Sequence, residues 1–170
     1  MSETETLSPA LPDEIEAAAR DVLTRACNAD LKLATAESCT GGMLASLLTD
    51  VEGVSSTFER GFVVYSEDAK CELLHVARNL VGQCGAVSRD VALAMADGAL
   101  AASRADVALS ITGFAGPGGP DDEPGLVHFA CARKGRDTAH REAHFGDIGR
   151  GPTRIACLRV ALEMIGNALD

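Results

Sequence analysis

Residues 35–42 (Thr-Ala-Glu-Ser-Cys-Thr-Gly-Gly) place a carboxylate, a hydroxyl and a thiol beside a pair of glycines. These groups belong to Glu37, Ser38 and Cys39, and the last two are potential nucleophiles. Residues 31–36 predict a short strand, and the apolar residues that follow the glycines recur at helical spacing (Met43, Leu44, Leu47, Leu48 and Val51). A nucleophile at a strand-to-helix turn faces unpaired N–H groups and the positive end of the helix dipole. Such a turn can bind an anion or stabilise an oxyanion, although a helix merely capped by Thr40 explains the local residues equally well.

A serine nucleophile needs a base, and Lys70 is a better candidate for that role than any of the four histidines. It follows Tyr65 by five residues, just inside a helix that Ser66 is expected to cap. A partly desolvated lysine loses its proton more readily, and Tyr65 could relay that proton. From the residues alone, a solvated Lys70 and a Tyr65 that ends a strand remain the simpler interpretation. We interpret the four histidines as surface or packing residues (His75, His128, His140 and His144).

A second segment, residues 112–124, is rich in glycine and proline and is expected to form a long loop. It follows residues 107–111, which predict a buried strand. If this strand runs parallel to the strand before Ser38, both loops emerge at the sheet edge where α/β proteins usually bind ligands. The loop matches no nucleotide fingerprint, so it is either a ligand lid with free backbone amides or a plain surface connection. Its acidic residues 121–123 are interpreted as a solvated turn, with a metal site as the alternative.

Arg150 and Arg154 flank the start of the last predicted helix. Because arginine offers a planar fork of donors, this position suits an anion at a helix N-terminus. A solvated helix face is the alternative interpretation.

The hydrophobic periodicity predicts a single compact α/β domain with a mixed sheet that helices cover on both faces. Helices are expected over residues 12–28, from 43, from 67, over 89–102 and at the C-terminus, where Ile155, Leu158, Leu162, Ile165 and Leu169 step by three and four. Strands are expected over residues 31–36, 58–65, 107–111, 126–132 and 138–145, the last two as an antiparallel pair. Residues 1–9 are predicted to form a flexible tail, and residues 10–170 to form the domain.

The composition limits the kinds of partner that the protein is expected to bind. A formal net charge of −10 argues against nucleic acid or an anionic membrane surface, since phosphates require clustered lysine and arginine. The six cysteines have no spacing typical of zinc, and neither a signal peptide nor a membrane-spanning run is found, which predicts a cytoplasmic protein. We expect a homo-oligomer (a dimer or higher), because small α/β domains with apolar faces often self-associate.

Taken together, these segments resemble the CinA C-terminal domain family, the nicotinamide-nucleotide amidases (nicotinamide mononucleotide deamidases). The resemblance lies in residues 35–42, residues 58–66 with Lys70, residues 85–88 and residues 105–117, and it covers nearly all of the chain from Pro12 onward. It implies hydrolysis of nicotinamide mononucleotide to nicotinic acid mononucleotide and ammonia, within pyridine-nucleotide recycling. No metal or organic cofactor is expected, and the domain would stand alone, without the larger N-terminal domain fused to it in some members.

Carried over onto this chain, the resemblance implies that Ser38 is the nucleophile and that Tyr65 and Lys70 activate it and shuttle its proton to the ammonia. Substrate binding is expected from the residues around the two loops and the last helix (Glu37, Thr40, Gly41, Gly42, Thr112, Gly113, Ala115, Gly116, Arg150 and Arg154). Backbone N–H groups around Gly41, Gly42, Thr112 and Gly113 would hold the oxyanion or the ribose phosphate.

One departure from the family pattern concerns the arginines. The family usually has Gly-Asp-Arg with a second arginine four residues later, whereas here Ile148 and Gly149 separate Gly146-Asp147 from Arg150. Two other hypotheses remain open: a non-catalytic nucleotide-binding or regulatory module of the competence or damage-inducible type, and an amidase whose nucleophile is Cys39. We expect Cys39 to face the interior, because it is one step out of phase with Ser38.

Overall fold

A computed structural model describes residues 11–170, apart from the side chain of Ser55. The flexible tail predicted at residues 1–9 lies outside the described residues. The described chain forms one five-stranded sheet in the order β2-β1-β3-β4-β5. The strands are β1 (Leu33–Glu37), β2 (Phe58–Val63), β3 (Val107–Gly113), β4 (Leu126–Arg133) and β5 (Ala139–His144). β1 is parallel to β2 and β3, and β4 is antiparallel to β3 and β5, so the predicted mixed sheet is confirmed.

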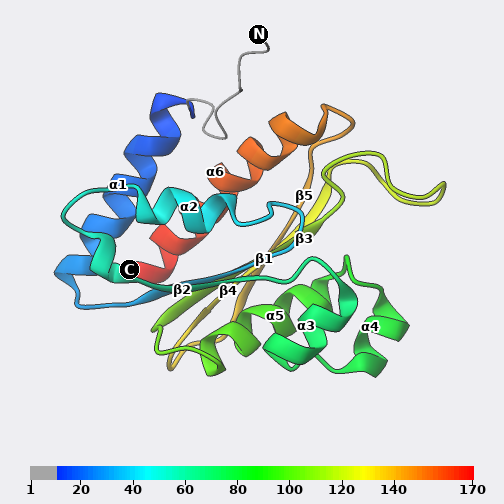
Figure 1. The fold of residues 1–170 in the computed structure, drawn as a ribbon, viewed down its shortest axis with the longest axis horizontal. Helices are drawn as coiled ribbons and strands as arrows, with labels where there is room; N and C mark the ends of the chain where they lie inside the picture. Colours follow the sequence, from blue (N-terminus) through cyan, green and yellow to red (C-terminus); the bar gives the residue numbers. More distant parts are fainter. Residues whose placement is uncertain (1–10) are drawn as a thin grey trace, which may run out of the picture.

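Helices cover both faces of the sheet, as predicted (Figure 1). One face carries α1 (Asp13–Asn28), α2 (Met43–Thr49) and α6 (Arg150–Leu169), and the other carries α3 (Glu67–Leu74), α4 (Arg78–Cys84) and α5 (Arg89–Ala101). A short 3₁₀ helix, η1 (Ser55–Thr57), precedes β2. Among residues 11–170, no helix is both long and apolar enough to cross a membrane.

The two faces of the sheet differ in the size of their side chains. Because successive strand residues point to opposite faces, Leu109 packs in the larger core cluster beneath α1, α2 and α6, while Ala108 packs on the side of α5. On that side, Ser110 donates its hydroxyl to the Ala92 carbonyl of α5 at 2.7 Å. Small side chains therefore allow α5 to lie close to the strands, which accounts for an alanine-rich core with few aromatic residues.

Three elements differ from the prediction. Helix α4 was not predicted, since it contains Gly82 and buries only Val81, so it has no amphipathic pattern. β2 ends at Val63, two residues early, because the chain then turns toward α3. β3 continues through Gly113, which pairs with Val127 of β4 instead of opening the loop. A Cβ at Gly113 would lie 2.6 Å from the Val127 side chain, so close strand packing requires this glycine.

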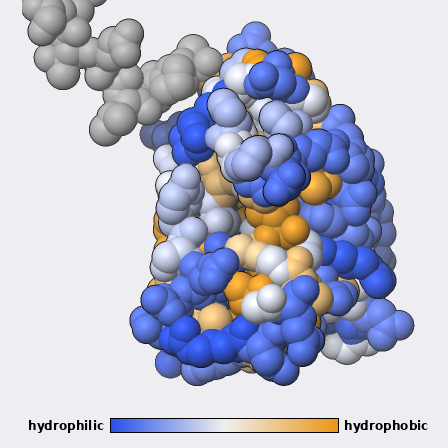
Figure 2. Space-filling view, turned by 90° about the vertical axis from the view of Figure 1, so that its right-hand side faces the viewer, coloured by the Kyte–Doolittle hydropathy of each residue, from blue (hydrophilic) through white to orange (hydrophobic). Residues whose placement is uncertain are grey.

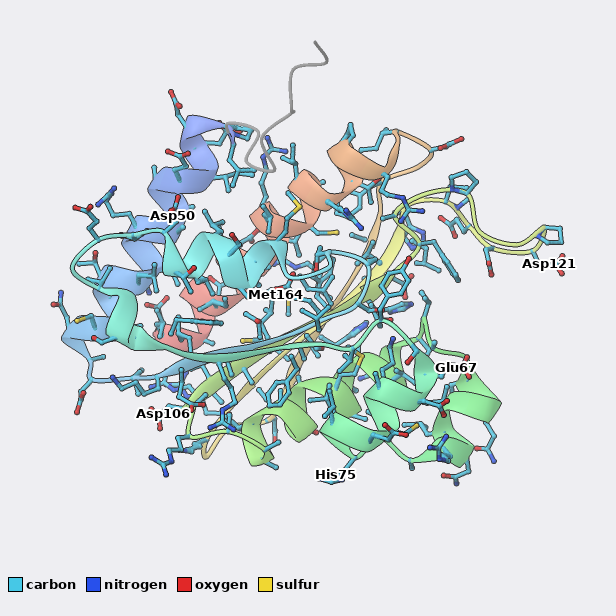
Figure 3. All side chains as sticks on the ribbon, viewed as in Figure 1. Asp50, Glu67, His75, Asp106, Asp121 and Met164 are labelled. Atoms are coloured by element: carbon cyan, nitrogen blue, oxygen red, sulfur yellow. The ribbon has the colours of Figure 1, made fainter. Side chains whose placement is uncertain are left out.

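The connection between β3 and β4, residues 114–125, extends away from the sheet as an arm, with Asp121 near its tip (Figure 3). Asp122 closes the arm by accepting a hydrogen bond from the Gly119 N–H at 2.6 Å. Glu123 lies 2.6 Å from Nδ1 of His144 on β5. The acidic residues thus form a turn that is tied back to the sheet. Among residues 11–170, no group of three or more His, Cys, Asp or Glu side chains is arranged to hold a metal ion.

Candidate active site

The turn between β1 and α2 lies at the carboxyl ends of the parallel strands, next to the end of β3. The Ser38 N–H donates to the Ile111 carbonyl at 3.0 Å, which continues the β1–β3 pairing by one residue. Strand alternation directs Ser38 to the same face as Ala34 and Ala36, where α3 and α5 pack, and directs Cys39 to the opposite face. The predicted meeting of the two loops at one sheet edge is confirmed.

Ser38 and Lys70 form a buried pair. Lys70 Nζ lies 2.9 Å from Ser38 Oγ and donates a second hydrogen bond to the Val64 carbonyl at 2.8 Å. Only 1% of Lys70 is exposed, although the residue lies in the first turn of α3, behind the predicted cap Ser66, whose hydroxyl accepts from the Ala69 N–H. The solvated Lys70 that local sequence favoured is therefore wrong.

Burial lowers the pKa of Lys70, because removing water disfavours the ammonium form. The pKa is partly restored by Cys39, Glu67 and Cys71, whose negative forms would favour a charged lysine. A neutral amine at this position can donate one hydrogen to the Val64 carbonyl while its lone pair accepts from Ser38. This is the arrangement of a general base beside a hydroxyl nucleophile.

The pair opens into a pocket of about 220 Å³. Its lining comes from five segments of the chain (Ser38, Cys39, Tyr65, Lys70, Ala86, Val87, Thr112, Gly113, Ala115 and Arg150). Figure 2 looks onto this side of the molecule, where hydrophobic residues gather in the middle of a hydrophilic margin. Ala86 and Val87 were not named as site residues from the sequence, although they lie within residues 85–88, which carry part of the family resemblance.

Tyr65 lies at the mouth of this pocket and is 65% exposed. Among residues 11–170, no hydrogen bond joins its hydroxyl to Ser38 or Lys70, whose bonds go to each other and to Val64. Proton relay by Tyr65 thus stays a prediction that requires movement of the side chain on substrate binding.

Glu37 and Thr40 do not line the pocket. The fully buried Glu37 carboxylate accepts from the N–H groups of Leu44 and Ala45 at 3.1 and 2.8 Å. Thr40 is buried, and its hydroxyl has no partner among the described residues. The arrangement gives no support to substrate binding by these two side chains, and it is Glu37, not Thr40, that caps α2.

The two glycines of the turn have left-handed backbones, with φ of 61° at Gly41 and 96° at Gly42. Other residues rarely adopt these angles, so both positions require glycine. The Gly41 N–H donates to the Ser38 carbonyl at 3.1 Å and so closes the turn. An oxyanion role for Gly41 would therefore compete with this bond.

The second loop contributes the opposite wall of the pocket. Thr112 donates its hydroxyl to the Ala86 carbonyl at 2.8 Å and so ties β3 to the segment before α5. Gly113 and Ala115 line the pocket, whereas Gly116 lies just behind, where a Cβ would be 3.1 Å from the Arg150 guanidinium.

The two arginines occupy different positions. Arg150 is exposed and lines the pocket, whereas Arg154 donates from Nε to the Cys39 carbonyl at 2.8 Å. Arg154 therefore braces the turn from α6, and Arg150 is the cation that faces the pocket.

Cys39 points into the core, as predicted, where it packs in the same cluster as Cys157 of α6. The neighbouring Cys157 thiol lowers the pKa of Cys39, and Arg154 adds to this effect, while burial opposes it. The histidines stay outside the pocket lining: His128 contacts His140 at 3.1 Å, and His144 contacts the exposed carboxylates Glu123 and Glu142.

The family model of the CinA C-terminal domain matches residues 15–169. The chain belongs to this family. The chain is also similar to solved structures of the family: it superposes with a TM-score of 0.90 on the competence/damage-inducible protein CihA from Agrobacterium tumefaciens, at 45% identity, covering 95% of this chain and 99% of that one. A CinA superfamily protein from Escherichia coli gives a TM-score of 0.84 at 35% identity, covering 92% of each chain.

Among curated family members, the nicotinamide-nucleotide amidohydrolase PncC of Escherichia coli K12 is 51% identical over 116 residues, which are 66% of this chain and 70% of PncC. A CinA-like protein of Akkermansia muciniphila is 52% identical over 111 residues, 64% of this chain. The matched part is only 27% of that relative.

Proposed function

We propose that this chain is a nicotinamide-nucleotide amidohydrolase that converts nicotinamide mononucleotide to nicotinic acid mononucleotide and ammonia. The observation that carries the proposal is the buried hydrogen bond of 2.9 Å between Ser38 and Lys70 at the base of a pocket. The similarity to PncC supports the substrate. Residues 10–170 are the proposed amidase domain.

In the proposed reaction, neutral Lys70 accepts the Ser38 proton as Oγ attacks the carboxamide carbon. The tetrahedral intermediate collapses when protonated Lys70 delivers that proton to the amide nitrogen, and ammonia leaves an acyl ester on Ser38. A water molecule then attacks the ester while Lys70 again accepts a proton. The returning proton regenerates the Ser38 hydroxyl, and the product leaves as a carboxylate.

Two further features support the nucleotide as substrate. Of residues 11–170, Arg150 is the only arginine that lines the pocket, which suits it to the ribose phosphate. The proposed oxyanion donors are the backbone N–H groups of Gly113, which lines the pocket, and of Gly42 in the turn after Ser38. One such donor contributes about 3 kcal/mol of transition-state stabilisation in other hydrolases.

The decisive assay measures ammonia release from nicotinamide mononucleotide by the wild type and by Ser38→Ala. We expect turnover by the wild type and its loss in Ser38→Ala, with substrate affinity retained. Binding without hydrolysis by the wild type would instead favour the non-catalytic nucleotide-binding module. Full turnover by Ser38→Ala would refute the serine mechanism.

The assembly and the compartment also remain proposals. Four large apolar side chains are exposed in the described part of the chain (Val63, Tyr65, Leu73 and Ile148), which supports self-association. Sedimentation of the purified protein tests the proposed homo-oligomer, and a single monomeric species would contradict it. All six cysteines are free thiols in the structure, which supports a cytoplasmic location.

A further inference from the structure

Glu37 is a buried carboxylate that the proposed reaction does not use. Its side chain is fully buried, and each of its oxygens accepts one backbone N–H from the first turn of α2. The N-cap residue of that helix is Gly42, which has no side chain to serve as a cap. Glu37 therefore satisfies the helix end from the strand on the far side of the turn.

This contact closes the five-residue turn that contains Ser38. The turn begins at Glu37 and ends at α2, and the Glu37 side chain joins the two ends directly. Within this closed turn, the Gly41 N–H donates to the Ser38 carbonyl, and the Met43 N–H donates to the Thr40 carbonyl. The position of Ser38 Oγ thus depends on a loop whose span is set by one side chain.

The backbone of Glu37 also leads to the other member of the pair. Its carbonyl accepts from the Val64 N–H at 2.8 Å, and the Val64 carbonyl accepts from Lys70 Nζ at 2.8 Å. Glu37 is therefore bonded covalently to Ser38 and is linked to Lys70 by two hydrogen bonds through a single residue, Val64. A shift of residue 37 would change both ends of the 2.9 Å hydrogen bond.

We propose that Glu37 is a positioning residue, whose two hydrogen bonds to α2 hold Ser38 Oγ within reach of Lys70 and orient the turn toward the reacting carbon. The proposal rests on the amidohydrolase function, in which the pair is the nucleophile and its base. Neither Glu37 oxygen lines the pocket, so the residue acts through Ser38 and not on the substrate.

The chemistry of the side chain defines the variants. In Glu37→Gln the amide NH₂ faces one of the two N–H donors, so one hydrogen bond is lost while the volume is kept. In Glu37→Asp the charge is kept, but the carboxylate is one methylene short of α2. Val22→Ala in α1 is the control, because Val22 is buried against α6 and is absent from the pocket lining, so it lowers stability without touching the turn.

The experiment measures three quantities for each variant: kcat and KM with nicotinamide mononucleotide, the rate at which phenylmethylsulfonyl fluoride sulfonylates Ser38, and the melting temperature. We expect both Glu37 variants to lose about 10-fold to 100-fold in kcat and in sulfonylation rate, with KM within about twofold of the wild type. Val22→Ala should lose melting temperature alone.

A purely structural role predicts a lower melting temperature but wild-type kcat and sulfonylation rate in the folded variants, and this result would overturn the proposal. If Glu37→Gln does not fold, Glu37→Asp decides by the same readouts. If the wild type is sulfonylated but releases no ammonia, the proposed function fails, and the sulfonylation rates alone decide the role of Glu37. A wild type that reacts with neither compound overturns both.

Discussion

Gly98 is a residue of α5 outside the pocket, yet its substitution should impair the Ser38–Lys70 pair. A Cβ at Gly98 would lie 2.0 Å from the carbonyl oxygen of Leu74, whereas ordinary contact begins at 3.4 Å. The Gly98→Ala substitution must therefore separate α3 from α5 by about 1.4 Å at this point. Leu74 is the last residue of α3 and lies one helical turn after Lys70, so the displacement moves Lys70, the proposed base, away from Ser38.

The expected change in stability of Gly98→Ala follows from two opposing contributions. Overpacking in a closed interface costs about 1–3 kcal/mol, while alanine in place of glycine gains about 1 kcal/mol within a helix. A net loss of about 1 kcal/mol lowers the melting temperature of a chain of this size by about 2–4 °C. Catalysis should suffer more, since a misplacement of about 1 Å can cost about 100-fold in rate.

The assay compares kcat and melting temperature for Gly98→Ala with those for Gly82→Ala. Gly82 lies inside α4, where an added Cβ meets no atom within 4 Å, so this control should keep kcat and gain stability. Wild-type kcat in Gly98→Ala, together with the expected loss of melting temperature, would refute the argument that α3 positions the base.

Four more predictions concern the pocket itself. Lys70→Met should abolish ammonia release without lowering the melting temperature at neutral pH. The pKa of Lys70 is lower in the folded protein than in the unfolded chain, so Lys70 destabilises the fold most at pH values below its folded pKa. Its contribution to the unfolding free energy disappears as the pH rises through the unfolded pKa. Calorimetry should therefore show that any excess stability of Lys70→Met over the wild type shrinks over this pH range. For the same reason, the wild-type kcat/KM should rise with pH through that lowered pKa. Cys39→Ala should retain most activity, and inactivity there combined with an active Ser38→Ala would make the thiol the nucleophile. Gly116→Ala crowds the Arg150 guanidinium and should raise KM for the mononucleotide more than for the phosphate-free riboside; equal changes would remove Arg150 from phosphate binding.

The fold could be predicted from the sequence wherever one apolar pattern dominated. Helix α6 and strand β1 have strong periodicity or continuous apolar runs and lie where expected, and β3 begins at the predicted residue, Val107. Helix α4 buries only Val81, so its helical form depends on packing beside α5 and leaves little trace in the residue pattern. The extension of β3 to Gly113 depends on pairing with Val127 of β4, and such pairing between distant segments cannot be predicted from the residues of either segment alone.

The sequence predicted several residues that line the candidate site, but not the geometry in which they lie. Alternation along β1 correctly separated Ser38 from Cys39, because period two is a local property of a strand. The burial of Lys70 could not be predicted locally, since it depends on the Val64 carbonyl and on the distance between α3 and the sheet. The contact between Glu37 and α2 was missed for a similar reason: a glutamate before a nucleophile is equally consistent with binding substrate and with capping a helix.

The small side chains on one face of the sheet connect the composition to the chemistry. Ala108 and Ser110 allow α5 to approach the strands, and Gly98 allows α3 to approach α5. Each close approach brings the first turn of α3 nearer to β1, so that a lysine of ordinary length reaches Ser38 while its stem stays buried. Larger residues at these positions would give the sheet a better filled hydrophobic face but would leave Lys70 in solvent with its ordinary pKa. The alanine-rich core is therefore a condition for burying Lys70 beside Ser38, and the stability that larger side chains would add is incompatible with the role proposed for this lysine.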